Sequence, residues 1–236
     1  ISVLPLDSVD SYLKSFLGGK KSFSEAAKRA DLLMIKINKN KNDGVFHIKL
    51  LPVEIKSYGI NSQDKKYKKP PEEAIEQLKD TLKNLTLLKE ELNNSSNNSL
   101  KDTSLASLIE TSLILSGQEH SEFIRNTMEN CANGNYKICS KSGLVLYFVN
   151  EAVTVGHETP VEIYKADSST KVLFADPFHF HEALWNDTED TINDQFSKII
   201  QLCLEDIEEE CAIEAIKKTN IEKSDDDITQ QEQVIV

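Results

Sequence analysis

The stretch "LLPVEIKSYG", residues 50–59, begins as an apolar run and ends in alternating charged and apolar residues. Side chains on a strand alternate between its two faces. We therefore expect Glu54 and Lys56 to project together from one face, while Val53 and Ile55 point into the core on the other. The pattern predicts a buried strand that carries an acid and an ammonium group near its end.

A hairpin partner precedes this strand. Residues 31–37, "DLLMIKI", are apolar and β-branched, which favours a strand. The turn that follows contains an Asp-Gly pair, which supplies the positive φ angles of a hairpin turn. Pairing with residues 45–58 brings Asp31, at the start of the first strand, beside Glu54 and Lys56. Pro52 within the second strand predicts a bulge or a strand edge.

Asp31, Glu54 and Lys56 together suit the hydrolysis of a phosphodiester. Two carboxylates offer the hard oxygen ligands that Mg²⁺ prefers, with water and phosphate completing its coordination. A nearby ammonium can orient a water molecule or stabilise charge on the phosphate. The alternative is a cross-strand ion pair on an exposed sheet face, with no catalytic role.

The rest of the chain alternates between helical and strand patterns. Apolar residues recur at helical spacing in 72–90, the clearest helix of the sequence. The order of elements predicts an α/β (α+β) fold with a mixed central sheet flanked by helices. We expect one domain over residues 1–218 and an acidic tail over 219–236. Within the domain we expect short helices at 8–17 and 22–30, a core motif region at 22–90, a helical insertion at about 93–140, further strands at 143–176 and a C-terminal helix at 194–217.

The arrangement of Asp31 followed by Glu54-Ile55-Lys56 resembles the PD-(D/E)xK nuclease superfamily. The family places a helix, a strand hairpin and a second helix in this order, and the resemblance covers about residues 22–90. Ala30 stands where the family name has proline, and Pro52 is an unusual residue in the strand of Glu54. The resemblance implies a restriction-endonuclease-like fold and the activity of a metal-dependent DNA endonuclease.

The resemblance also assigns roles to residues. It implies that Asp31 and Glu54 bind Mg²⁺ or Mn²⁺ and that Lys56 orients the attacking water. Gln77, in a Gln-Leu pair of the second helix, would brace the site, and Glu25 of the preceding helix is a possible additional acid. The alternative is a catalytically inactive nuclease-fold module that docks partners or holds DNA.

A basic loop follows the motif at residues 65–69, "KKYKK". Its functional interpretation is DNA binding, in which Lys65, Lys66, Lys68 and Lys69 grip phosphates and Tyr67 stacks on a base. Its other interpretation is a solvated surface loop.

The charge is unevenly distributed along the chain. Residues 1–89 hold 17 Lys and Arg against 11 Asp and Glu, a net charge of +6, whereas residues 90–236 hold 10 against 28, a net charge of −18. The first part is compatible with a polyanion such as DNA, and the second part is not.

The N-terminal segments suggest a larger context. "SVLPLDSVDSYL" and "KRADLLMI", residues 2–13 and 28–35, are similar to segments of large ATPases in bacterial DNA-restriction and defence systems, including phosphorothioation-dependent restriction. The missing start methionine predicts a domain of a longer cytoplasmic protein. We therefore expect other domains or subunits of a restriction complex, including an ATPase, as partners. No apolar run reaches the roughly 20 residues that span a bilayer, so no membrane partner is expected.

Two further groups could hold a metal. The cysteines, Cys131, Cys139, Cys203 and Cys211, have spacings unlike those of zinc sites, which favours buried free thiols. His179, His181 and Glu182 lie among aromatic residues, which favours a packed segment over a metal site.

Overall fold

The computed structural model describes residues 1–7, 29–40, 44–58, 72–93, 99–115, 117, 122–149, 161–165, 167 and 169–175, with 198, 200, 201, 203–205 and 207 near the C-terminus. Several sequence predictions lie outside these residues: the short helices at 8–17 and 22–30, Glu25, the basic loop at 65–69, the His179–Glu182 segment and the acidic tail.

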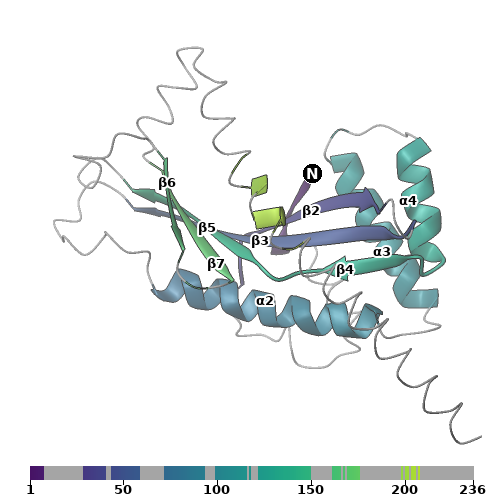
Figure 1. Cartoon of the computed structure of the whole chain (residues 1–236), viewed down its shortest axis with the longest axis horizontal. Helices are drawn as coiled ribbons and strands as arrows, with labels where there is room; N and C mark the ends of the chain where they lie inside the picture. Colours follow the sequence, from purple (N-terminus) through teal and green to yellow (C-terminus); the bar gives the residue numbers. More distant parts are fainter. Residues whose placement is uncertain are drawn as a thin grey trace, which may run out of the picture.

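The described strands form one mixed sheet of seven strands in the order β1-β2-β3-β5-β7-β6, with β4 also paired to β3 (Figure 1). Neighbouring strands run antiparallel in β1–β2, β2–β3 and β6–β7, and parallel in β3–β4, β3–β5 and β5–β7. The predicted mixed sheet of an α+β protein is confirmed. The strands are β1 (Ser2–Pro5), β2 (Leu32–Lys39), β3 (Phe46–Tyr58), β4 (Tyr136–Cys139), β5 (Gly143–Val149), β6 (Val161–Lys165) and β7 (Thr170–Ala175).

Strand β3 is the central strand of the sheet and pairs with β2, β4 and β5. Its register with β2 is unbroken, from Lys39 opposite Phe46 to Leu32 opposite Val53. On its other side β3 pairs first with β4 and then, from Val53 onward, with β5. Of the two alternatives predicted for Pro52, the bulge is wrong, whereas the strand edge is confirmed on this side of β3, where neither β4 nor β5 pairs with residues 50–52. Pro52 falls in the interval between these two partners, where a residue without an amide hydrogen costs the ladder least.

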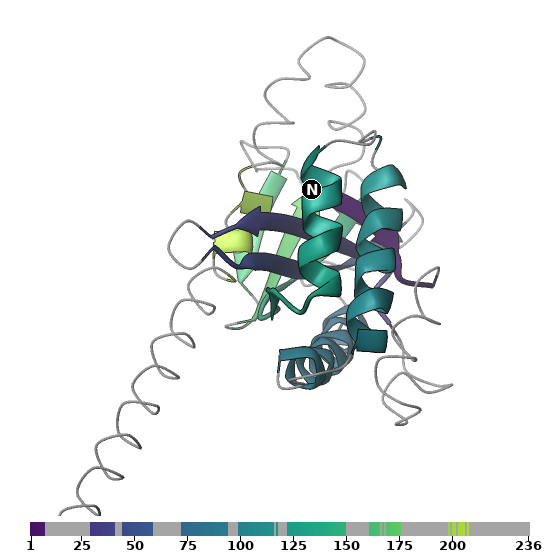
Figure 2. The ribbon, with the colours of Figure 1, turned by 90° about the vertical axis from the view of Figure 1, so that its right-hand side faces the viewer.

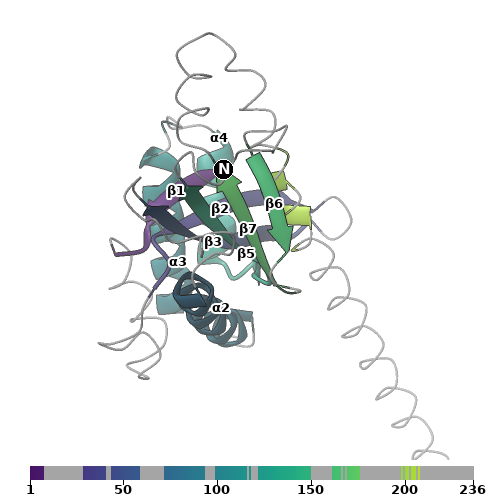
Figure 3. The same cartoon turned by 90° about the vertical axis from the view of Figure 1, so that its left-hand side faces the viewer.

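Helices cover both faces of the sheet. Helix α2 (Glu72–Asn93) runs along one face, and the helical residues between 198 and 207 lie on the opposite face (Figure 1). Helices α3 (Ser99–Leu115) and α4 (Glu122–Ala132) lie side by side against the end of the sheet near β2 and β3 (Figure 2). Figure 3 shows α2 end-on beneath the sheet, with β6 and β7 nearest the viewer.

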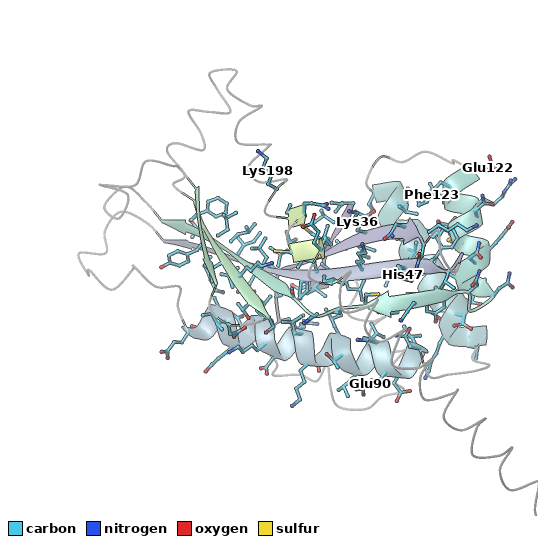
Figure 4. All side chains as sticks on the ribbon, in the orientation of Figure 1. Lys36, His47, Glu90, Glu122, Phe123 and Lys198 are labelled. Carbon is cyan, nitrogen blue, oxygen red and sulfur yellow. The ribbon has the colours of Figure 1, made fainter. Side chains whose placement is uncertain are left out.

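The alternation of apolar residues supplies a core to each face, as expected for a sheet covered by helices on both sides. One core faces α2, α3 and α4 and includes Leu33, Ile35, Leu50, Leu78 and Leu85. The other faces the C-terminal helical residues and includes Met34, Leu51, Val53, Cys203, Leu204 and Ile207. On this second face Lys36, labelled in Figure 4, donates to Gln201 Oε1 at 3.2 Å.

The segment expected as a helical insertion is helical over α3 and α4 and then returns to the sheet as β4. Asn93 at the end of α2 pairs with this strand: its Oδ1 accepts the Ile138 N–H at 3.0 Å, and its Nδ2 donates to the Ile138 carbonyl at 3.1 Å. The amide side chain thus acts as a one-residue strand partner for β4.

Cysteine chemistry differs in part from the prediction. Cys131 and Cys203 are buried free thiols, as predicted. Cys139 is disulfide-bonded, so the free thiol predicted there is wrong. A disulfide requires Cα atoms within about 7 Å, and spacing along the chain does not reveal that proximity.

None of the helices in the described part of the chain combines the length and the apolar character needed to cross a membrane.

Candidate active site

The hairpin brings Asp31 beside Glu54. The last residue pair of β2 and β3 is Leu32 opposite Val53, so Asp31 and Glu54 occupy the next position, where β2 ends. The Asp31 carboxylate folds toward β3, and its Oδ2 accepts the Ile55 N–H at 2.7 Å. Two acids separated by 22 residues in sequence thus meet at one end of the hairpin.

Glu54 and Lys56 project from the same face of β3, as the alternation predicts. The Lys56 Nζ lies 2.5 Å from the Glu54 Oε1, and the side chains of Glu54 and Lys56 are 0% and 26% exposed. Val53 and Ile55 pack in the core of the opposite face. The ion pair of the alternative interpretation is present, but it does not lie on an exposed sheet face, because the Glu54 carboxylate is buried.

The charges of the site depend on one another. Burial raises the pKa of Glu54, and the charge of Asp31 adds to this; the hydrogen bond and charge of Lys56 oppose it but leave the pKa raised. Burial lowers the pKa of Lys56, but its hydrogen bond to Glu54 and the charges of Glu54, Asp31 and Glu73 outweigh burial and raise it. Lys56 therefore remains an ammonium at neutral pH.

Helix α2 presents one row of side chains to this cluster. Glu73, Gln77 and Thr81 are four residues apart and share a helix face. Glu73 acts electrostatically on Lys56, and Thr81 accepts a hydrogen bond from the Ala30 N–H at 2.9 Å. Gln77 lies between them, half-buried, and its buried Oε1 has no hydrogen-bond partner among the described residues. The helix thus places Gln77 on the face turned toward the cluster.

Ala30 stands where the resembled motif has proline, and its backbone explains the difference. Its N–H donates to the Thr81 Oγ1, a bond that proline could not make because it has no amide hydrogen. Thr81 and Glu73 are two site residues that were not predicted from the sequence. Glu73 was visible only as one of two acids at a helix start, and nothing local in the sequence links Thr81 to Ala30.

The donor set suits a hard divalent cation. Both oxygens of the Glu54 carboxylate are buried; one is paired with Lys56, and Oε2 has no hydrogen-bond partner within the described part of the chain. Asp31 adds a second carboxylate, with Oδ2 on the Ile55 amide. Among the described residues no group of three or more His, Cys, Asp or Glu could hold a metal. Mg²⁺ requires only one or two protein carboxylates besides water and phosphate.

Comparison of the chain with protein-family models, with curated proteins and with solved structures found no match.

Proposed function

We propose that this chain is a metal-dependent DNA endonuclease domain of the PD-(D/E)xK type, with a restriction-endonuclease-like fold. One observation carries the proposal: a fully buried carboxylate, Glu54, lies beside Asp31 and an ammonium, Lys56, at the end of a hairpin. Burying a charged group is costly, so a buried acid with an oxygen left without a partner among the described residues calls for a ligand.

Each site residue would have a separate role in phosphodiester hydrolysis. Asp31 and Glu54 would hold Mg²⁺ or Mn²⁺, which when bound lowers the pKa of water and neutralises charge on the leaving oxygen. Lys56 would orient the water oxygen toward phosphorus and stabilise the charge gathering on the phosphate. Gln77 would brace the site from α2. The P–O bond to the leaving oxygen breaks as the new P–O bond forms.

The substrate and context are proposed from the charge distribution. The first 89 residues carry a net charge of +6, against −18 for the remainder. We assign DNA contact to the first part, including Lys65, Lys66, Tyr67, Lys68 and Lys69, and partner contact to the second. A restriction, defence or repair protein with an ATPase would supply the remaining grip on DNA.

A second function has one observation in its favour. The ion pair of Glu54 with Lys56 partly neutralises the buried acid without any metal, as in a catalytically inactive module that docks partners or holds DNA. The two functions differ in what Mn²⁺ does to stability. A ligand that binds the folded state at 100 times its dissociation constant stabilises it by about 2.7 kcal/mol.

Thermal unfolding with and without Mn²⁺ therefore tests the proposal. We expect Mn²⁺ to raise the Tm of the wild type and Asp31→Asn to remove most of the rise. Glu90→Gln is the matched control, because Glu90 is an exposed acid on the outer side of α2 (Figure 4) and should keep the full rise. A Tm that Mn²⁺ does not change, or an equal rise in wild type and Asp31→Asn, would favour the inactive module.

A further inference from the structure

Thr81 joins helix α2 to the segment that carries Asp31. Its Oγ1 accepts the Ala30 N–H at 2.9 Å, and its hydroxyl donates to the Gln77 carbonyl at 2.9 Å. The side chain is 0% exposed, so water does not compete for either bond. One hydroxyl thus links two segments that are 51 residues apart in sequence.

Asp31 depends on such links because it precedes β2, which begins at Leu32. It is held at two points of its own: its carbonyl accepts the Leu6 N–H at 2.9 Å, and its Oδ2 accepts the Ile55 N–H at 2.7 Å. Leu6 follows β1 and Ile55 lies in β3, so neither bond involves helix α2. The bond from Ala30 to Thr81 links this stretch of backbone to helix α2, which also carries Gln77.

We propose that Thr81 is a positioning residue for the active site, which holds Ala30 against α2 and thereby fixes the Asp31 carboxylate on the Ile55 amide beside Glu54. The consequence for metal binding rests on the proposed function; the positioning of Asp31 does not. The hydroxyl is the essential feature, so Thr81→Ser should preserve the role and the equally large Thr81→Val should remove it.

Thr127 provides a matched control. Threonine hydroxyls often bond to the carbonyl four residues earlier in a helix, and Thr127 does so with the Phe123 carbonyl at 2.8 Å. It is also 0% exposed, but it lies on α4. Thr127→Val therefore reproduces the loss of a buried intrahelical hydroxyl bond at a distance from Asp31.

Amide hydrogen exchange without metal measures the positioning directly. The Ile55 amide donates to the Asp31 carboxylate, and the Leu50 amide of the same strand serves as the reference. We expect Thr81→Val to raise the exchange rate of Ile55 relative to Leu50 by about fivefold or more, the effect of weakening one hydrogen bond. Thr81→Ser and Thr127→Val should leave the ratio at its wild-type value. A ratio unchanged in Thr81→Val overturns the proposal, as does an equal rise in Thr127→Val.

Calorimetric titration with Mn²⁺ separates this inference from the proposed function. Loss of a residue that supports a metal ligand typically weakens binding about 10–100-fold, and we expect this loss in Thr81→Val with recovery in Thr81→Ser. If Asp31→Asn binds Mn²⁺ as tightly as the wild type does, the proposed metal function fails. A changed exchange ratio in Thr81→Val would still support the positioning role. If Asp31→Asn does weaken it but Thr81→Val changes neither readout, the positioning role fails alone.

Discussion

Replacing Lys56 with methionine should destabilise the protein through the acid that it leaves behind. Met keeps most of the side-chain volume but removes the ammonium that lies 2.5 Å from the Glu54 Oε1. Removing one partner of a buried ion pair costs about 3–5 kcal/mol, because the other charge remains buried without compensation. Glu54 is 0% exposed but Lys56 retains 26% exposure, so we expect about 2–4 kcal/mol.

A double-mutant cycle isolates this cause from lost packing. In the Glu54→Gln background there is no buried carboxylate that could lose its positive partner. Lys56→Met should therefore lower the free energy of unfolding much less there. We expect a coupling energy of about 2 kcal/mol between the two positions, within the range for residues in contact. A destabilisation of about 3 kcal/mol would lower the Tm by about 6–12 °C in a chain of this size.

Urea unfolding of the wild type, both single variants and the double variant supplies the four free energies. Lys36→Met is a suitable control, because Lys36 donates to the uncharged side-chain amide of Gln201. Its replacement therefore leaves no buried carboxylate without its positive partner. A coupling energy below about 0.5 kcal/mol, the level expected for independent sites, would refute the idea that Lys56 compensates the buried Glu54.

Three further predictions concern the scaffold, each measured by urea unfolding. Burial lowers the pKa of Lys49 from 10.5 to about 8, so the folded state binds fewer protons than the unfolded state between these values; stability should rise with pH from about 8 to 10.5, and Lys49→Met should lack this rise. Gly143→Ala should cost about 1–3 kcal/mol, because a Cβ would lie 2.7 Å from the Leu78 Cγ; a neutral effect would contradict the contact, and Leu78→Ala should remove most of the cost. Asn93→Ala should cost about 1–3 kcal/mol through the two lost hydrogen bonds with Ile138, and an unchanged unfolding free energy would refute its role on β4.

Local patterns predicted the hairpin and helix α2 well. Alternation of side chains is a property of the strand itself, so it correctly placed Glu54 and Lys56 on one face and Val53 on the other. The hairpin pairing then followed from the Asp-Gly turn and placed Asp31 beside Glu54.

Long-range contacts were beyond these patterns. Strands β1 and β4 have four residues each, too few for a periodicity, and β4 depends on Asn93 and on β3 for its partners. Lys49 lies in the same strand as the site and is fully buried. Other segments of the chain pack over its face of the sheet, and the strand pattern alone does not show that this face is covered. The link from Thr81 to Ala30 depends on how α2 docks, and no local signal reports docking.

Within the site, sequence and structure contributed different parts. The sequence named Asp31, Glu54, Lys56 and Gln77, and the structure added the burial of Glu54, the only one of them that is 0% exposed. Burial changes the physical interpretation, because an exposed pair contributes little whereas a buried carboxylate stays ionised only beside a compensating cation. This requirement underlies both the proposed metal site and the predicted instability of Lys56→Met.

Cleavage of supercoiled plasmid DNA in the presence of Mn²⁺ tests directly whether this chain is a metal-dependent nuclease that acts through Glu54. The wild type and the control variant Glu90→Gln should convert the plasmid to nicked or linear forms, whereas Glu54→Gln, which keeps the size of the side chain but not its charge, should not. Equal cleavage by the wild type and Glu54→Gln, or no cleavage by the wild type, would contradict this proposal.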